Sequence, residues 1–158
     1  MISEGGKAHN ITVTASDGSS INLASPGQPL VLYFYPKDDT SGCTREAQDF
    51  TALASEFEKA GTWLLGVSKN SPKDHAKFTT KYDLKVPLAT DADGHVTEAF
   101  GVWVQKSMYG RKYMGIERAT FLIGEDGRIA RAWRKVSVPG HAEEVLAAAR
   151  ALKGTRPS

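Results

Sequence analysis

The sequence predicts an α/β protein in which helices flank a central mixed sheet, and three patterns lead to this prediction. A continuous apolar run over 30–35 is followed by an amphipathic helical pattern and a second apolar run over 63–68. Two short apolar segments, 119–123 and 129–133, flank a turn-forming stretch and indicate an antiparallel hairpin. A last helical pattern follows this hairpin and is expected to cover the sheet.

The N-terminal part of the chain is expected to form a β-hairpin. The segments 11–15 and 21–23 flank a turn rich in Ser, Asp and Gly. Pro26, Gly27 and Pro29 then interrupt regular structure before the next strand.

A strand–helix–strand unit follows. The run 30–35 is apolar throughout, which is typical of a strand buried on both faces. Apolar side chains then recur at helical spacing and predict a helix over 44–60 that ends at Gly61. Residues 63–68 are the next predicted strand. Because a helix connects the two strands, they should be parallel.

The second half of the chain adds shorter elements. Ser71 and Pro72 have the residue types that begin a helix, which is expected to run to about Tyr82. The remaining predicted elements are a strand over 88–90, a short helix over 95–100, strands over 119–123 and 129–133, and a final helix over 141–152. Residues 154–158 are expected to fray.

This order of elements matches the thioredoxin plan. A parallel βαβ unit, an antiparallel hairpin and a closing helix form that plan, and the N-terminal hairpin and one inserted helix are additions. The sequence has no linker, repeat or low-complexity tract, so we expect residues 1–158 to form one domain.

Composition excludes several classes of protein. Of the 158 residues, 41% are hydrophobic and 24% are charged, which argues against a disordered chain. The net charge of +2 and the lack of Lys/Arg runs argue against a nucleic-acid partner. No stretch approaches the ~20 apolar residues of a membrane helix, so no membrane association is expected. Residues 1–10 lack the apolar core of a secretory signal.

Cys43 is the only cysteine, so the chain can form neither an intramolecular disulfide nor a cysteine-rich zinc site. An unpaired thiol fits the reducing cytoplasm. No metal site is expected, because the four histidines are far apart in the sequence and share no ligand spacing: His9, His75, His95 and His141.

The position of Cys43 in the sequence favours a reactive thiol. A single cysteine is most often an inert core residue. This one lies where the loop 36–43 meets the start of the predicted helix 44–60. The unpaired N–H groups and partial positive charge at a helix start favour a thiolate. Fast reaction with a slow electrophile would also require a hydroxyl and a fixed cation that stabilise charge on the leaving atom.

The residues around this cysteine resemble those of the peroxiredoxins. Residues 36–43, Pro-Lys-Asp-Asp-Thr-Ser-Gly-Cys, match the signature P-x-x-x-[TS]-x-x-C of that family. The longer run 33–46 resembles the bacterioferritin comigratory protein branch, also called peroxiredoxin Q, and so do the segments 101–103 and 106–123. The resemblance extends over residues 11–152, which is nearly the whole chain.

The resemblance implies roles for four residues. Cys43 is similar to the peroxidatic cysteine, whose thiolate attacks one oxygen of a peroxide. Thr40 is similar to the hydroxyl that binds and orients the peroxide, and Arg118 to the cation that stabilises the thiolate and the departing oxygen. Pro36 is similar to the residue that shields the pocket from water. No metal, flavin or haem cofactor is implied.

The residues themselves leave some alternatives open. Thr40 also fits a turn or helix cap, and Arg118 a solvated charge at the end of a strand. Glu46, three residues after Cys43, fits a helix cap or a partner for an arginine and is left out of the catalytic set. His141 is expected only to begin the last helix.

Most large apolar side chains are assigned to the core. The aromatic residues expected in the core are Tyr33, Phe34, Tyr35, Trp63 and Trp103. Whether Met108, Tyr109 and Met114 line the rim of the pocket is left open.

The chain departs from the family at the resolving cysteine. Many members of the branch have a second cysteine five residues after the first, and others have it in the next long helix. Gln48 and Thr79 occupy these positions here. The chain is therefore expected to act as a 1-Cys enzyme, in which an outside thiol reduces a sulfenic acid on Cys43.

The predicted function is that of a thiol peroxidase, a thioredoxin-dependent peroxiredoxin. Its expected substrates are hydrogen peroxide and organic hydroperoxides, and its expected reductant is thioredoxin, or glutaredoxin with glutathione. A monomer in the cytoplasm is expected. One alternative is a redox sensor that passes the oxidation of Cys43 to a partner protein as a mixed disulfide. Another is a binding module on a thioredoxin scaffold with an incidental cysteine.

Overall fold

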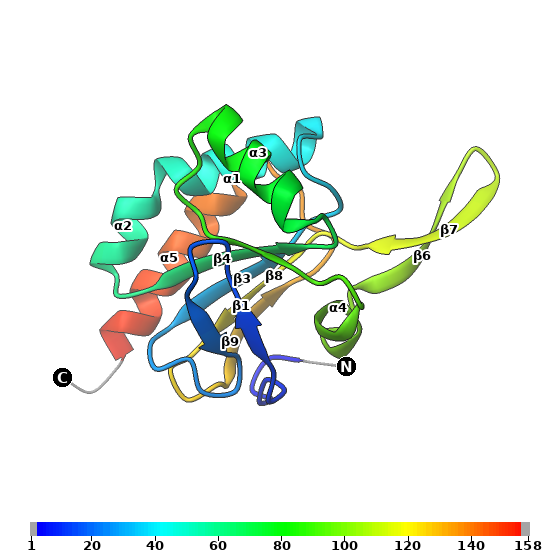
Figure 1. The fold of residues 1–158 in the computed structure, drawn as a ribbon. Coiled ribbons are helices and arrows are strands. Elements are labelled where there is room, and N and C mark those ends of the chain that lie inside the picture. Colours follow the sequence, from blue (N-terminus) through cyan, green and yellow to red (C-terminus); the bar gives the residue numbers. More distant parts are fainter. Residues whose placement is uncertain (1–2, 156–158) are drawn as a thin grey trace.

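The computed structural model describes residues 3–155 and has a five-stranded sheet at its centre (Figure 1). In spatial order the strands are β5 (Leu88–Thr90), β4 (Trp63–Ser68), β3 (Leu30–Phe34), β8 (Ala119–Ile123) and β9 (Ile129–Trp133). β3, β4 and β5 are parallel, whereas β8 is antiparallel to both β3 and β9. The mixed sheet predicted from the sequence is therefore confirmed.

The register of the central strand β3 decides which chain segments meet at its end. Phe34, the last residue of β3, lies opposite Ala119, the first residue of β8. Because the two strands are antiparallel, the loop that leaves β3 and the residue that precedes β8 lie at the same end of the sheet. That loop begins with Tyr35 and Pro36, and the preceding residue is Arg118.

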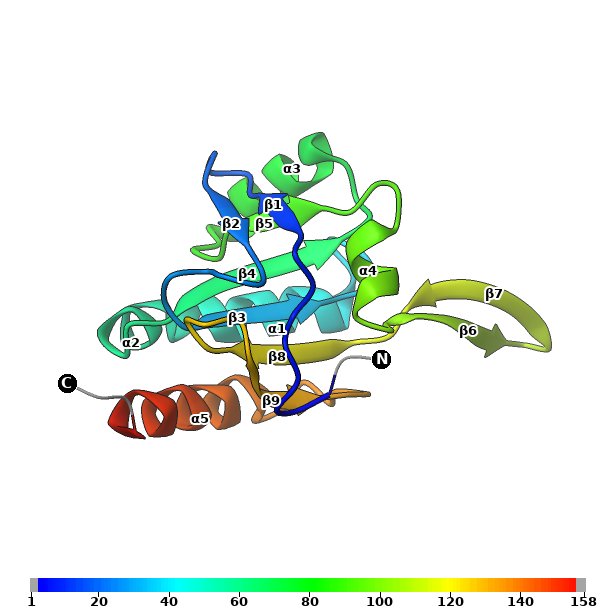
Figure 2. The same ribbon diagram turned by 90° about the horizontal axis from the view of Figure 1, so that it is seen from below.

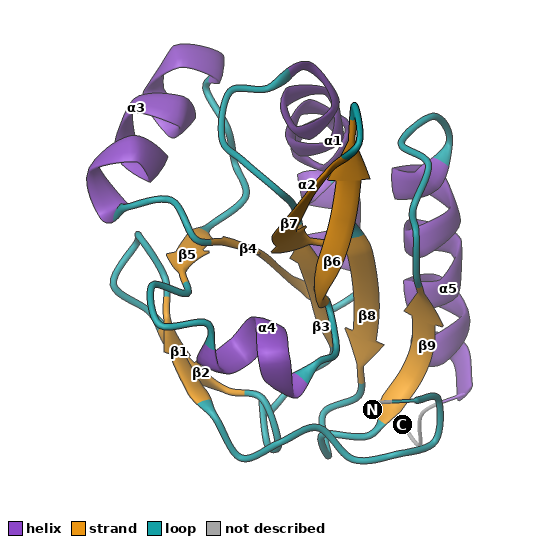
Figure 3. Ribbon diagram, turned by 90° about the vertical axis from the view of Figure 1, so that its right-hand side faces the viewer, coloured by secondary structure: helices purple, strands orange, loops and turns teal. Residues whose placement is uncertain are grey.

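Two hydrophobic cores cover the two faces of the sheet. The helices are α1 (Ser41–Ala52), α2 (Ala54–Lys59), α3 (Pro72–Tyr82), α4 (His95–Ala99) and α5 (His141–Thr155), and a hairpin consists of β1 (Thr12–Thr14) and β2 (Ser20–Asn22). Side chains alternate along β3, so Val31 and Tyr33 pack against α1, α2, α3 and α5. Leu32 and Phe34 instead pack against α4 and the β1–β2 hairpin. Figure 3 shows α1 and α3 on one side of the strands and α4 on the other.

The helix predicted over 44–60 differs from the observed structure in two ways. It begins earlier, because α1 starts at Ser41 and includes Cys43. It is also interrupted at Leu53, whose φ of −103° and ψ of 5° are not helical, and α2 follows. Apolar residues continue at helical spacing across this interruption, which is why the sequence pattern does not reveal it.

A second hairpin was not predicted. It consists of β6 (Trp103–Met108) and β7 (Arg111–Ile116) and projects from the body of the molecule (Figure 2); we call it the arm. Tyr109 and Gly110 form its turn and both have positive φ, 53° and 78°, as a two-residue hairpin turn of this kind requires. Side chains are exposed on both faces over most of the arm, so its sequence lacks the alternation of a half-buried strand.

The other predicted elements are confirmed with small shifts at their ends. α5 runs to Thr155, beyond the predicted 152, and residues 156–158 of the tail lie outside the described residues. Tyr33, Phe34 and Tyr35 are buried as predicted, but Trp63 is 42% exposed, so its assignment to the core was wrong. Within residues 3–155, no helix combines the length and apolarity needed to cross a membrane.

Candidate active site

Cys43 is the third residue of α1, and its side chain is buried. The N-cap residue of this helix is Thr40, whose side chain makes no capping hydrogen bond. The first N–H groups of a helix have no intrahelical partner, and the helix dipole adds partial positive charge there. Both effects stabilise an anion at this end of a helix, and Cys43 lies in its first turn.

Arg118 lies beside this sulfur. Its Nη2 donates a hydrogen bond to Cys43 Sγ over 3.2 Å, and its Nη1 donates one to Glu46 Oε1 over 2.6 Å. Gly42 leaves room for the guanidinium, since a Cβ at that position would lie 3.2 Å from Nη2. The structure therefore brings Cys43 and Arg118 together at one end of the sheet, at the distance of a direct hydrogen bond.

Glu46 is part of the site, although the sequence interpretation left it out. It follows Cys43 on the same face of α1 and is 1% exposed. Burial raises the pKa of its carboxyl group to about 7, against the opposing effect of Arg118. Burial also opposes the charge of Arg118, but Glu46 and Cys43 together raise the pKa of the guanidinium. The available sequence signal was an acidic residue on an otherwise apolar helix face.

Thr40 and Pro36 belong to the loop between β3 and α1. The Oγ1 of Thr40 donates a hydrogen bond to the carbonyl oxygen of Lys37 over 2.8 Å. Thr40 thus also stabilises the turn, and its hydroxyl oxygen keeps lone pairs that can accept a further hydrogen bond. Pro36 begins the loop and is exposed.

The arm contributes a second cation near the site. Lys106 on β6 is half-buried, and its side chain packs beside Gly115 on β7. Burial lowers the pKa of Lys106 and Arg118 lowers it further, while Cys43 acts in the opposite direction. The ammonium group is therefore within electrostatic reach of the Cys43–Arg118 pair. The three residues whose place at the rim was left open lie exposed on the arm: Met108, Tyr109 and Met114.

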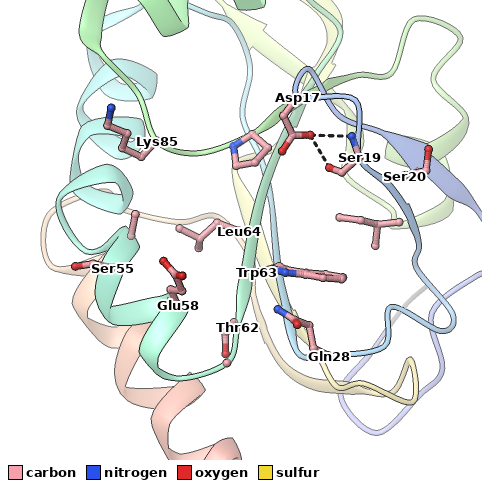
Figure 4. Close-up of a pocket in the computed structure, with 14 residues that line it drawn as sticks. Asp17, Ser19, Ser20, Gln28, Ser55, Glu58, Thr62, Trp63, Leu64 and Lys85 are labelled. Atoms are coloured by element: carbon pink, nitrogen blue, oxygen red, sulfur yellow. Dashed lines mark hydrogen bonds between the residues drawn. The ribbon is translucent and has the colours of Figure 1, made fainter.

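A pocket of about 790 Å³ lies away from Cys43, between α2, the β1–β2 hairpin and the start of β4 (Figure 4). Trp63, Leu64 and Gln28 are among the residues that line it. Trp63 begins β4, whereas Cys43 follows the end of β3, which is parallel to β4. The pocket and Cys43 therefore lie at opposite ends of the sheet.

The side chains around Cys43 point to thiol chemistry. Among the residues that the structure describes, no three His, Cys, Asp or Glu side chains lie close enough to hold a metal ion. A sulfur at a helix start with a guanidinium at hydrogen-bond distance is suited to act as a nucleophile.

Comparison with protein families matches residues 5–132 to the AhpC/TSA family. The chain belongs to the AhpC/TSA family. Peroxiredoxin Bcp of Xanthomonas campestris pv. campestris is 48% identical over 143 residues, which cover 90% of this chain and 89% of that protein. Peroxiredoxin Bcp of Bacillus subtilis is 43% identical over 143 residues, which cover 90% of this chain and 91% of that protein. This AhpC/TSA protein is thus a peroxiredoxin of the bacterioferritin comigratory protein branch, and a thiol peroxidase.

Solved structures of similar proteins agree with this assignment. The Xanthomonas campestris bacterioferritin comigratory protein, studied for its alkyl peroxide reduction activity, has a TM-score of 0.83 at 46% identity and covers 90% of this chain and 92% of its own. A cysteine-to-serine mutant of Xylella fastidiosa PrxQ has a TM-score of 0.88 at 41% identity and covers 96% of this chain and 98% of its own. The predicted thioredoxin-like fold is confirmed.

The relatives differ from this peroxiredoxin in their cysteines. The Xanthomonas campestris peroxiredoxin Q has been solved as two mutants in which different cysteines are replaced by serine, so that protein has at least two. This AhpC/TSA chain has only Cys43 and is a 1-Cys variant of the branch.

Proposed function

We propose that Cys43 is the peroxidatic cysteine of this peroxidase and that its substrates are hydrogen peroxide and small organic hydroperoxides. The observation that carries this proposal is the hydrogen bond from Arg118 Nη2 to Cys43 Sγ at the start of α1. A fixed cation and a helix N-terminus together supply what a thiolate nucleophile needs.

The first half of the reaction oxidises Cys43. The thiolate attacks one oxygen of R–O–O–H, an S–O bond forms and the O–O bond breaks. The departing oxygen takes a proton and leaves as R–OH, and Cys43 becomes a sulfenic acid. Negative charge moves from sulfur to the departing oxygen during this step. The contact between Arg118 and the sulfur supports a role for Arg118 in stabilising that charge.

Thr40 and Pro36 have supporting roles in the proposal. The Oγ1 of Thr40 already donates to Lys37, so it accepts the O–H hydrogen of the peroxide and orients the O–O bond toward sulfur. Pro36 lacks an N–H group and has a fixed φ, which presets the start of the loop and keeps water from one side of the thiol.

The second half of the reaction requires a thiol from outside the chain. An attacking thiol forms a mixed disulfide with the Cys43 sulfur and releases water, and a second thiol then frees Cys43. Thioredoxin, or glutathione with glutaredoxin, fits this role.

We propose that residues 1–158 act as one domain and as a monomer. The free thiol favours a reducing location, the cytoplasm.

The test measures consumption of hydrogen peroxide and of an alkyl hydroperoxide by the full chain in the presence of thioredoxin or glutathione. We expect steady turnover, and we expect Cys43→Ser to abolish it. Activity retained by Cys43→Ser would disprove the role of Cys43. A single stoichiometric oxidation without turnover, followed by transfer to another protein, would favour the redox-sensor alternative.

A further inference from the structure

The loop that carries the proposed peroxide site is anchored by a buried polar cluster that the reaction scheme does not use. Asp38 lies in the middle of this loop and is buried, although Pro36, Lys37 and Thr40 around it are exposed. Its Oδ2 lies 2.6 Å from Nδ1 of His75 on α3, and its Oδ1 accepts a 2.5 Å hydrogen bond from the hydroxyl of Tyr35.

The partners of His75 define what it contributes. The ring is 1% exposed, and its Nε2 lies 3.1 Å from the carbonyl oxygen of Ala89. A carbonyl oxygen only accepts, so Nε2 carries a hydrogen. The short contact between Nδ1 and Asp38 then contains one further proton. His75 therefore gives the buried carboxyl group of Asp38 a hydrogen-bond partner and connects it to β5 through Ala89.

Further contacts hold the same loop against α3 and the segment before it. The backbone N–H of Asp38 donates to Oδ1 of Asn70 over 2.9 Å. The next residue, Asp39, has a left-handed φ of 59° and accepts hydrogen bonds from Lys81 Nζ at 2.8 Å and from the hydroxyl of Tyr82 at 2.5 Å. The loop thus has a buried anchor at Asp38 and an exposed anchor at Asp39.

We propose that His75 is a positioning residue of the peroxidase: its pair with Asp38 fixes the loop, and through the loop it aligns Thr40 and the start of α1 with Cys43. This inference rests on the proposed function of Cys43. Thr40 follows Asp38 by two residues and is the N-cap of α1, so a displacement of Asp38 moves the proposed peroxide acceptor relative to the sulfur. A displacement of about 1 Å in a reacting geometry is enough to slow a reaction by ~100-fold.

The exposed anchor at Asp39 is expected to contribute less. Lys81 and Asp39 are both solvent-exposed, and exposed ion pairs stabilise proteins weakly. In contrast, removal of one member of a buried pair leaves the other member buried without a partner, which is strongly unfavourable. The buried anchor should therefore control the alignment of the loop.

Two substitutions of His75 separate its two hydrogen bonds. An asparagine side chain places an N–H donor near the position of Nδ1, so His75→Asn retains the bond to Asp38 and loses the bond to Ala89. A glutamine places its donor near the position of Nε2, so His75→Gln retains the bond to Ala89 and loses the bond to Asp38. Each variant loses one contact of the ring, which makes them matched controls for stability.

The experiment measures the rate of Cys43 oxidation by hydrogen peroxide and, separately, its alkylation by iodoacetamide, which requires a reactive thiol but no peroxide alignment. We expect His75→Gln to slow oxidation by ~10-fold or more and alkylation by less than ~3-fold, while His75→Asn stays within ~3-fold of wild type in both. Lys81→Met, which removes only the exposed anchor, should also stay within ~3-fold.

Equal oxidation rates in all variants would overturn the proposal, and so would parallel losses of oxidation and alkylation in both His75 variants, which indicate a merely structural role. If His75→Gln does not fold, Tyr35→Phe removes the other side-chain contact of Asp38, and its oxidation should then slow more than its alkylation. Equal slowing of the two would again reject the proposal. A wild-type Cys43 that peroxide does not oxidise would instead reject the proposed function itself.

Discussion

The guanidinium of Arg118 passes so close to Gly42 that a methyl group at Gly42 would lie 3.2 Å from Nη2. Arg118 cannot easily retreat from such a contact, because the bond from its Nη1 to Glu46 is only 2.6 Å long. A side chain at position 42 would therefore press on the guanidinium that contacts Cys43.

Gly42→Ala should slow the oxidation of Cys43 without lowering the stability of the protein. In a helix, alanine is more stable than glycine by about 0.5–1 kcal/mol, so the melting temperature should not fall. The added methyl group should displace Arg118 and slow the oxidation of Cys43 by ~3-fold or more. Stopped-flow oxidation and thermal unfolding test both effects, with Ser41→Ala at the neighbouring exposed position as control. Unchanged oxidation in Gly42→Ala would show that the guanidinium adjusts without loss.

Arg118→Ala should slow the oxidation of Cys43 by ~100-fold or more, the scale expected when one preorganised donor is removed. Arg111→Ala removes an exposed arginine of the arm and is the control for net charge. Wild-type rates in Arg118→Ala would remove Arg118 from the proposed mechanism.

Glu46 should make folding stability depend on pH. Its pKa is raised to about 7, chiefly by burial, so the folded protein binds the proton more tightly than the unfolded chain. The resulting stabilisation is complete below the pKa of unfolded Glu, near 4.5, and is lost as the pH rises through 7. Relative to Glu46→Gln, the free energy of unfolding of wild type should fall by up to about 3 kcal/mol between pH 4 and pH 8.

Denaturant unfolding of both proteins at several pH values measures this difference. Glu46→Gln is a suitable reference, because glutamine keeps an oxygen that accepts the hydrogen bond from Arg118 but does not titrate. Parallel stability curves for the two proteins would contradict the raised pKa of Glu46.

Excess peroxide should inactivate the wild-type enzyme when no reductant is present. With a single cysteine no internal disulfide traps the sulfenic acid, so a second peroxide oxidises Cys43 to the sulfinic acid. Intact-mass measurement across a peroxide titration should show the addition of two oxygen atoms. A wild-type protein that stops at one added oxygen under a large excess would show that the pocket itself prevents overoxidation.

Gln48→Cys should protect the enzyme only if α1 opens. Gln48 is exposed and Cys43 is buried, so their side chains leave the same helix in different directions. A disulfide between positions 43 and 48 therefore requires the first turns of α1 to unwind. Loss of two mass units on oxidation, without addition of oxygen, would report this opening, and Gln48→Ser is the matched control.

Most of the fold follows from local patterns in the sequence. The strands at 63–68, 88–90, 119–123 and 129–133 were predicted with the observed ends, because short apolar segments and neighbouring turn residues both mark them. The arm could not be predicted in this way, since its stability comes from pairing between two exposed strands rather than from an apolar face. The same limit applies to the exposed Trp63, whose residue type alone suggested burial.

The site was predictable to the extent that it lies in one sequence motif. The order of Pro36, Thr40 and Cys43 is visible in the sequence, and the resemblance added Arg118. For Glu46 the sequence left open a pairing with an arginine, which the structure confirms, and it did not single out His75, because each residue contacts a partner distant in the sequence. Glu46 meets Arg118 across 72 positions, and His75 meets Asp38 across 37. Such pairs become visible only when the sheet brings their segments together.

The arm also makes this enzyme a candidate for a peroxide biosensor. Its turn residue Tyr109 is 97% exposed, whereas Lys106 on the same hairpin is within electrostatic reach of Cys43. In the proposed reaction a thiolate at Cys43 becomes a neutral sulfenic acid, which changes the charge at the site. A fluorophore inserted at the tip would be held outside the sheet, yet carried by the strand that experiences this change in charge. Its emission before and after addition of peroxide would show whether the arm senses this change.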